Sequence, residues 1–153
     1  MSSTTEMTAE MWSAWRTFLA AQARLTIEID RRLRRDHGLT QAEYGSLAAL
    51  FESDGGRLRA GEIARRLGWE KGRTSHLLSR LERRDLVTRN VDPADGRATD
   101  VALTVQGRRI LLAAVRNHSR DVLELFVRPV GPDLTPLTAA MDRVLGNLDD
   151  QSR

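Results

Sequence analysis

The segment WEKGRTSHLLSRLERRDLV, residues 69–87, combines short hydroxyl side chains with basic ones around an apolar repeat. If the segment is helical, with about 100° per residue, one arc of its surface consists of Thr74, Leu77, Leu78 and Leu81. The opposite arc holds Gly72, Ser75, His76, Ser79 and Arg83, with Arg73 and Arg80 on its flank. Hydroxyl, imidazole and guanidinium groups donate hydrogen bonds to phosphates and to the O6 and N7 atoms of guanine. Because short side chains let a helix approach closely, the pattern predicts a helix that enters the DNA major groove.

An ordinary polar surface helix is the alternative interpretation of this segment. The distribution of charge along the chain favours DNA instead. The formal net charge is only +3, but residues 57–97 hold 11 Lys and Arg against 6 Asp and Glu, while the rest holds 13 against 15. Basic residues gathered in one part of a chain are typical of a surface that binds phosphates.

The elements around this helix follow the order α-α-(β)-α-α-β-β-α-α. The predicted helices are residues 8–35, 41–52, 62–67, 70–84, 104–127 and 134–148, and the predicted strands are 57–59, 86–91 and 98–103. Thr40 and Glu43 have the capping-box spacing that begins a helix, and Thr104 caps a later one. Glycine ends the first helix at Gly38 and the third at Gly68.

A hairpin is predicted directly after the basic helix. Residues 92–97, DPADGR, are rich in turn formers and join two segments of period-2 pattern. Beside a pair of helices, this hairpin would be the wing of a winged helix-turn-helix. Arg97 can enter a narrow minor groove, where the negative potential is strongest, with Asp95 restraining the loop or the guanidinium group. A solvent-exposed turn arginine is the alternative.

This arrangement resembles the MarR family of winged-helix transcriptional regulators along nearly the whole chain. The most specific stretch is IARRLGWEKGRTSHLLSRLERRDLVTRNVDPADGRATDVALTVQGR, in which the wing motif D-x-R falls on Asp95, Gly96 and Arg97. Two positions depart from the family pattern. Glu70 replaces the common Ser or Thr cap, and Asp85 replaces a common glycine at a cost of about 1 kcal/mol if the left-handed conformation is kept.

The resemblance implies a mainly α (α+β) fold, a winged helix-turn-helix with flanking N- and C-terminal dimerisation helices. The chain would be one domain, 1–153, with a DNA-binding lobe at 39–104 and dimerisation helices at 6–37 and 105–150. The expected DNA contacts are Arg59, Lys71, Arg73, Ser75, His76, Ser79, Arg80, Arg83 and Arg97, with Asp95 supporting the wing. Members of the family form homodimers, which would place two recognition helices about 34 Å apart on an inverted-repeat operator.

The apolar residues near both ends of the chain exceed what a small winged helix needs to cover itself. They are Trp12, Trp15, Phe18, Leu111, Leu112, Val115, Val122, Leu123, Leu125, Phe126, Leu134, Leu137, Met141, Val144, Leu145 and Leu148. This surplus agrees with a homodimer. Packing of the same residues within one monomer is the alternative.

Family members commonly bind small phenolic or anionic molecules beside the dimerisation helices. An aromatic acid would suit Trp15, Arg16, Tyr44 and His118, which are therefore candidate ligand contacts. Each of the four has a structural alternative as a core or interface residue. The absence of cysteine argues against the peroxide-sensing branch of the family.

Enzymatic function is not predicted, and neither a cofactor nor a metal is expected. Residues 56–61, GRLRAG, have the glycine spacing of a phosphate loop but lack the Lys-Ser or Lys-Thr that must follow. The three histidines are widely separated, without the spacing of a zinc pair. No secretion signal and no membrane-spanning run is recognisable, so a soluble cytoplasmic protein is expected.

The predicted function is a sequence-specific double-stranded DNA-binding regulator, in the form of a ligand-responsive repressor. The alternative is a winged-helix module that contacts protein or RNA without binding a specific operator.

Overall fold

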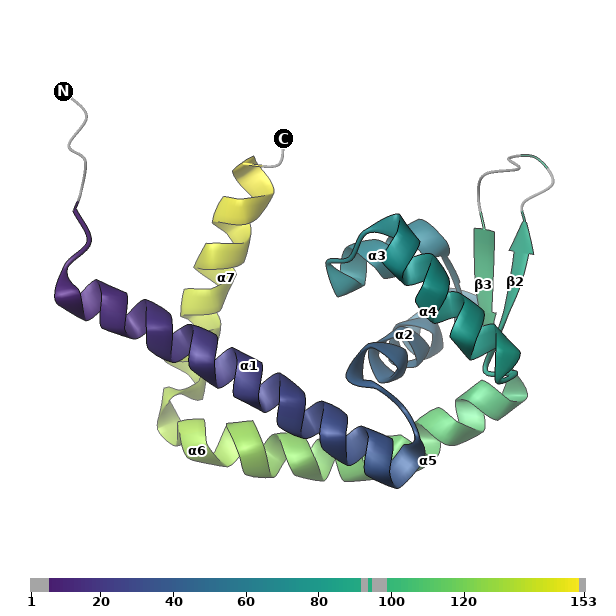
Figure 1. Ribbon diagram of the computed structural model, residues 1–153, viewed down its shortest axis with the longest axis horizontal. Helices are drawn as coiled ribbons and strands as arrows, with labels where there is room; N and C mark the ends of the chain where they lie inside the picture. The colour runs from purple at the N-terminus through teal and green to yellow at the C-terminus, as the bar shows by residue number, and fades with distance from the viewer. Residues whose placement is uncertain (1–5, 92–93, 95–98, 152–153) are drawn as a thin grey trace. The chain divides into compact units, whose positions relative to one another are not determined.

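The computed structural model describes residues 6–91, 94 and 99–151. The described residues up to His118 form one compact unit, and those from Ser119 onwards form a second. The first unit contains the long helix α1, the helices α2, α3 and α4, a small sheet and the start of α5 (Figure 1). The mainly helical winged helix-turn-helix predicted from the sequence is confirmed.

Helix α1, Ala9–His37, is capped by Thr8, whose Oγ1 accepts a hydrogen bond from the Met11 N–H at 3.2 Å. It ends two residues later than expected. Gly38 has φ 65° and donates its N–H to the Arg34 carbonyl at 3.0 Å. A left-handed residue after a helix is most readily a glycine, which has no Cβ to clash.

Helix α2, Gln41–Glu52, begins with the predicted capping box. The Glu43 N–H donates to Thr40 Oγ1 at 3.0 Å, and the Thr40 N–H donates to Glu43 Oε2 at 2.9 Å. A second carboxylate assists from α1, since the Gln41 N–H donates to Asp30 Oδ1 at 2.9 Å. Three of the N–H groups that a helix start leaves without helical partners are thus bonded.

The DNA-binding lobe predicted from sequence contains α3, Ala60–Leu67, and α4, Lys71–Arg83, followed by the strands of the hairpin. Strands β1, Arg57–Arg59, β2, Val87–Val91, and β3, Thr99–Leu103, form an antiparallel sheet in the order β1-β3-β2. Val101 of β3 lies opposite Leu58 on one side and Arg89 on the other. The short strand β1 is therefore a paired strand, as predicted.

The hydrophobic core lies where α2, α3, α4 and the sheet meet. It consists of Leu39, Leu47, Leu50, Ile63, Leu77, Leu78, Leu81, Leu86, Val87, Val101, Leu111 and Ala114, all of them buried. The predicted inner arc of α4 is confirmed, since Thr74, Leu77, Leu78 and Leu81 are all buried. Burying a leucine stabilises a fold by about 1.5–3 kcal/mol, so this arc sets the rotation of α4 about its axis.

Leu111 corrects the sequence interpretation. We expected it among the apolar residues that face a partner, but it is 1% exposed and belongs to the core. Its neighbours Leu112 and Val115 are exposed. One face of the first turns of α5, Val105–Val122, therefore packs into the core of the lobe.

The second unit consists of helical segments. After α5 follow a π-helical turn, Leu123–Val127, the short helix α6, Arg128–Val130, and a 3₁₀ turn, Gly131–Asp133. Helix α7, Leu134–Gln151, then extends three residues beyond the predicted end. The gap between the predicted helices 104–127 and 134–148 contains Gly131, which has φ 56°. No helix within the described residues has an apolar stretch long enough to cross a bilayer.

The base of the hairpin is closed by a tight approach of α5 to the end of α4. Asp85 has φ 55°, the left-handed conformation that its replacement of a glycine implied. Thr104 Oγ1 donates to the Asp85 carbonyl at 2.6 Å and accepts from the Gly107 N–H at 2.9 Å, so it caps α5 as predicted. A Cβ on Gly107 would lie 2.0 Å from the Leu86 carbonyl oxygen, closer than any real contact.

Replacing Gly107 with alanine is therefore predicted to destabilise the protein. Gly107→Ala should lower the free energy of unfolding in urea by about 2–3 kcal/mol, because the backbone of Leu86 must move. The matched control is Gly61→Ala in α3, where an added Cβ meets no atom within 4 Å. Alanine there should leave stability unchanged or raise it slightly. Equal unfolding midpoints for the two variants would contradict the role given to Gly107.

Candidate nucleic-acid interface

The outer surface of α4 carries the predicted recognition residues. Lys71, Arg73, Ser75, His76, Arg80 and Arg83 are exposed, and Ser79 is half-buried. The inner arc of the same helix is enclosed in the core, so these polar groups face away from it. Glu70 precedes α4 in extended conformation and makes no side-chain cap, as its departure from Ser or Thr suggested.

Arg59 of β1 lies near the start of α4. It borders a pocket of about 400 Å³ together with Lys71, Ser75, Arg89 and Thr99. The structure thus brings one predicted contact from the sheet beside two from the helix. The basic side chains here suit contact with a phosphate.

Arg73 is held by an aromatic ring. Its guanidinium carbon lies 3.6 Å from the ring centroid of Trp69, the residue two positions before α4. Such a cation–π contact stabilises an arginine pose by about 0.5–1 kcal/mol at an exposed site and leaves its N–H groups able to donate. No role was predicted for Trp69 from the sequence. Because Trp69 precedes the helix, helical spacing could not predict this contact.

Arg80 and Arg84 share a buried acidic partner on α2. Arg84 Nη1 donates to Glu43 Oε2 at 3.3 Å, and Arg80 Nε lies 3.7 Å from Glu43 Oε1. The Glu43 side chain is 5% exposed, whereas that of Arg80 is 49% exposed. The sequence identified Glu43 as a helix cap but not as a partner of α4, because partners 37 and 41 residues away leave no periodic signal.

The end of α4 is joined to the wing strand β2 by an ion pair. Arg89 donates from Nε to Glu82 Oε2 at 2.9 Å and from Nη2 to the same oxygen at 2.6 Å. These hydrogen bonds from Arg89 hold the pKa of Glu82 below its ordinary value. The described base of the hairpin is thereby attached to the helix. The predicted wing residues Asp95 and Arg97 lie outside the described residues.

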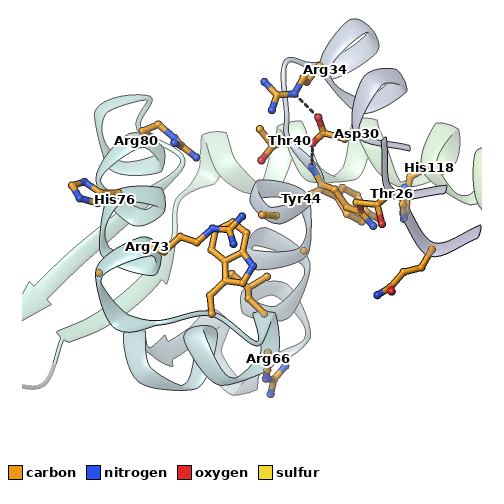
Figure 2. Close-up of a pocket in the computed structure, with 17 residues that line it drawn as sticks. Thr26, Asp30, Arg34, Thr40, Tyr44, Arg66, Arg73, His76, Arg80 and His118 are labelled. Atoms are coloured by element: carbon orange, nitrogen blue, oxygen red, sulfur yellow. Dashed lines mark hydrogen bonds and ion pairs between the residues drawn. The ribbon is translucent and has the colours of Figure 1, made fainter. Parts of the chain in front are cut away.

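A large groove borders α4 on the side of α1, and we call it the Tyr44 groove. Its volume is about 1230 Å³, and its lining comprises Gln22, Thr26, Asp30, Arg34, Thr40, Gln41, Ala42, Tyr44, Gly45, Arg66, Leu67, Trp69, Gly72, Arg73, His76, Arg80 and His118. Figure 2 shows Arg73, His76 and Arg80 on the α4 side and Thr26, Tyr44 and His118 across from them. The groove therefore shares three side chains with the candidate DNA-binding surface.

Two of the four candidate ligand residues meet in this groove. The rings of Tyr44 and His118 lie 4.2 Å apart, centroid to centroid. Burial raises the pKa of the Tyr44 hydroxyl, so this group stays protonated as a hydrogen-bond donor. Trp15 and Arg16 do not line the groove; Trp15 stacks on Phe18 at 5.8 Å.

The polar wall of the groove includes a charged contact at the start of α2. Asp30 accepts hydrogen bonds from the Gln41 N–H and, at 2.5 Å, from Arg34 Nε. Burial acts to raise the pKa of Asp30, but these two hydrogen bonds outweigh it and hold the pKa below its usual value. The buried Gln41 Oε1 accepts no hydrogen bond within the described part of the chain, so it can accept one from a ligand.

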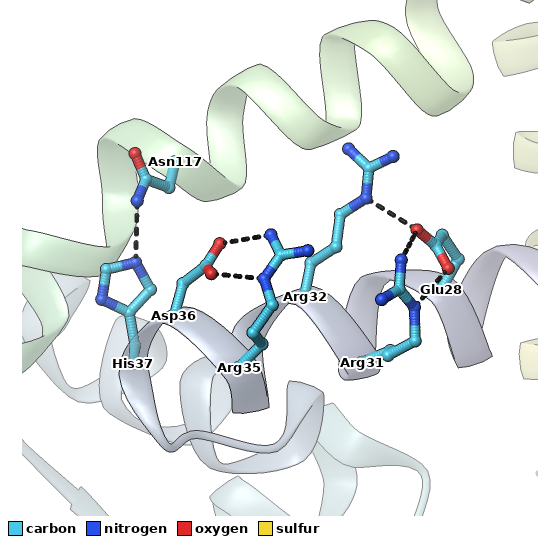
Figure 3. Close-up of polar contacts among 7 residues, drawn as sticks. All are labelled: Glu28, Arg31, Arg32, Arg35, Asp36, His37 and Asn117. Atoms are coloured by element: carbon cyan, nitrogen blue, oxygen red, sulfur yellow. Dashed lines mark hydrogen bonds and ion pairs between the residues drawn. The ribbon is translucent and has the colours of Figure 1, made fainter.

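Helix α1 divides into an apolar half and an ionic half. Its first half exposes large apolar side chains, Met11, Trp12, Trp15, Phe18 and Leu19. In the second half, Arg31 and Arg32 hold the carboxylate of Glu28 and lower its pKa to about 2 (Figure 3). His37 Nε2 lies 3.2 Å from Asn117 Nδ2, which joins the end of α1 to α5.

Metal chemistry has no site among the residues that the structure describes. There, no three His, Cys, Asp or Glu side chains gather closely enough to hold a metal ion. The arrangement instead offers hydrogen-bond donors and positive charge on the exposed face of a helix, which suits an anionic polymer.

Comparison with known proteins agrees with this fold. A sequence model of the MarR family matches residues 37–98. The crystal structure of AbsC, a MarR family transcriptional regulator from Streptomyces coelicolor, is 31% identical with a TM-score of 0.88, over 96% of this chain and 99% of that one. Sco3205, a MarR family regulator of the same organism solved in complex with DNA, is 29% identical with a TM-score of 0.87, over 95% and 91%.

Two relatives found by sequence are also transcriptional regulators. The HTH-type transcriptional regulator YsmB of Bacillus subtilis is 27% identical over 63% of this chain. The transcriptional regulator HosA of Escherichia coli is 34% identical over 50%. The matches span 66% and 56% of the lengths of these two relatives. MarR family proteins are transcriptional regulators and not enzymes. On the combined likeness in sequence and fold, this chain belongs to the MarR family of transcriptional regulators.

Proposed function

We propose that the protein is a homodimeric repressor that binds an inverted-repeat operator and releases it when a small aromatic or anionic molecule binds. The observation that carries the proposal is the two-sided character of α4. Its leucine arc is buried in the core, while its hydroxyl, imidazole and guanidinium groups are exposed. A helix placed in this way can lie in the major groove without disturbing the fold.

DNA binding is supported by the type and position of these groups. Arginine donates two hydrogen bonds at once to guanine or phosphate, and serine at close range bonds to phosphate or base edges. Sco3205, with a similar fold, is described in complex with DNA. In this proposal residues 39–104 form the DNA-binding lobe, and Arg97 of the wing contacts the minor groove.

Dimerisation is supported by apolar side chains that the monomer leaves exposed. On α1, Trp12 and Trp15 are each 48% exposed, and on α7, Val144, Leu145 and Leu148 are exposed as well. Exposed apolar patches on a globular protein mark interaction surfaces. The interface would lie within residues 6–37 and 105–150 and would be formed by the apolar side chains that are exposed there. A two-fold axis would then present two copies of α4 about 34 Å apart on one face of the duplex.

Ligand control is supported by the Tyr44 groove. The rings of Tyr44 and His118 suit an aromatic ring, while Arg34 and Arg73 suit a carboxylate. A ligand lowers DNA affinity to the extent that it prefers a dimer whose recognition helices are wrongly spaced. Since Arg73 and Arg80 also line the groove, a bound anion would compete with DNA for the same guanidinium groups.

The first prediction for this function concerns Arg73. DNase footprinting on the intergenic DNA beside the gene should reveal a protected inverted repeat. Arg73→Ala should weaken binding to it by about 1–3 kcal/mol, because a guanidinium contact is lost. The control Arg31→Ala removes the same charge from α1 and should bind as the wild type does. Equal affinity of wild type for all duplexes, or none for any, would favour a protein- or RNA-binding module instead.

The second prediction concerns the dimer. Trp15→Asp should shift sedimentation from dimer to monomer and weaken operator binding, because a charge replaces an apolar contact in the interface. Val91→Asp is the control for the dimer, since Val91 is 61% exposed at the end of β2 and lies outside both proposed dimerisation segments; its sedimentation should remain that of the wild type. A Trp15→Asp variant that remains dimeric would remove α1 from the proposed interface.

The third prediction concerns the groove. When hydroxybenzoates are titrated into the wild-type protein in a calorimeter, at least one should bind and lower the affinity of the protein for the operator. His118→Ala should reduce that binding, because the ring facing Tyr44 is lost, while operator affinity without ligand stays at the wild-type level. Unaltered ligand binding in this variant would show that the groove is not the ligand site.

A further inference from the structure

Glu43 carries a charge that its role as a helix cap does not require to be buried. The cap uses one carboxylate oxygen, Oε2, which accepts the Thr40 N–H at 2.9 Å. Capping glutamates can stay in solvent, yet this side chain is 5% exposed. An ionised carboxylate removed from water destabilises the fold unless opposite charges and hydrogen bonds compensate it.

The compensating charges come from the recognition helix. Arg84 at the C-cap of α4 donates to Oε2 at 3.3 Å, and Arg80, one turn earlier, approaches the other oxygen at 3.7 Å. Arg80 remains 49% exposed, so it is in contact with both the buried acid and the solvent. The acid therefore lies within ion-pair distance of an arginine that stands among the candidate DNA contacts.

We propose that Glu43 is a positioning residue for sequence recognition, which sets the pose in which Arg80 meets DNA. The inference rests on the proposed function, because it requires that α4 reads a duplex. Glu43 itself touches no DNA in this proposal; it acts through Arg80.

The physical argument is that a tethered arginine discriminates better than a free one. A free arginine loses side-chain entropy when it adopts one pose on a base or phosphate. At 3.7 Å the Nε contact is long, and the guanidinium keeps its terminal N–H groups for DNA. The tether therefore favours a site that fits the pose already held. It also offsets part of the charge of Arg80, which lowers attraction to any duplex regardless of sequence.

The test separates positioning from capping by using Glu43→Gln. Glutamine is the other residue that completes a capping box, so the cap is kept and the charge is lost. The duplexes are one selected by the wild-type protein from a random library and a scrambled duplex of the same length. Affinity for the selected duplex should fall about tenfold, while affinity for the scrambled one should stay level or rise, since the lobe gains net positive charge.

A double-mutant cycle identifies Arg80 as the side chain through which Glu43 acts. In an Arg80→Gln background, Glu43→Gln should cause no further loss on the selected duplex, because the residue to be positioned is gone. The control Glu28→Gln makes the same change in charge on α1, where Glu28 pairs with Arg31 and Arg32, and should leave both affinities unchanged.

The outcomes are distinct. An unchanged ratio of the two affinities in Glu43→Gln, or an equal loss with and without Arg80, overturns the proposal. If thermal unfolding shows that Glu43→Gln does not fold, Glu43→Asp replaces it; the shorter side chain keeps the negative charge but places it farther from Arg80, so the same fall in ratio is required. If the wild-type protein selects no sequence from the library, the proposed function is contradicted. This result is obtained without any Glu43 variant, so it is distinct from failure of the positioning role.

Discussion

The packing of the leucine arc of α4 against α2, α3 and the sheet is the interaction on which the interface depends. Leu77, Leu78 and Leu81 are buried together with Ile63 and Val101 in one core. Because these contacts set the rotation of α4 about its axis, they also decide that its serine, histidine and arginine side chains face outward. The exposure of these polar side chains is thus a consequence of the burial of the leucines. The same helix turned by half a revolution would expose its leucines and bury its arginines.

The start of α2 is a second organising point, because side chains from α1 and from the end of α4 bond to it. Asp30 reaches it from α1 through the Gln41 N–H, and the capping box adds Thr40 and Glu43 from α2 itself. Arg84 then joins α4 to Glu43. Backbone N–H groups at a helix start attract anions, so two carboxylates can sit there and still accept arginines from elsewhere. The start of α2 thus connects α1 with α4 through hydrogen bonds.

Much of this could be predicted from sequence, and the limits have physical causes. The two arcs of α4, the Thr40–Glu43 box and the left-handed Asp85 follow local periodicity or turn chemistry, and all are confirmed. Leu111 was misassigned because a core-facing and a partner-facing leucine look alike in a helix pattern. The pairing of Glu43 with Arg80 and Arg84 joins residues about forty positions apart, which no local pattern encodes.

The arginines on α4 and at its C-cap are held by chemically different means. Arg73 lies over the Trp69 ring, which fixes its position without offsetting its charge, whereas Arg80 and Arg84 approach a carboxylate that does offset theirs. A stacked arginine stays fully attractive to any anion, so Arg73 suits both a phosphate and a carboxylate in the Tyr44 groove. An arginine paired with a carboxylate attracts other anions less strongly, but the pairing restricts the direction of its side chain. One short helix can therefore combine a side chain that responds to charge with others that respond to geometry.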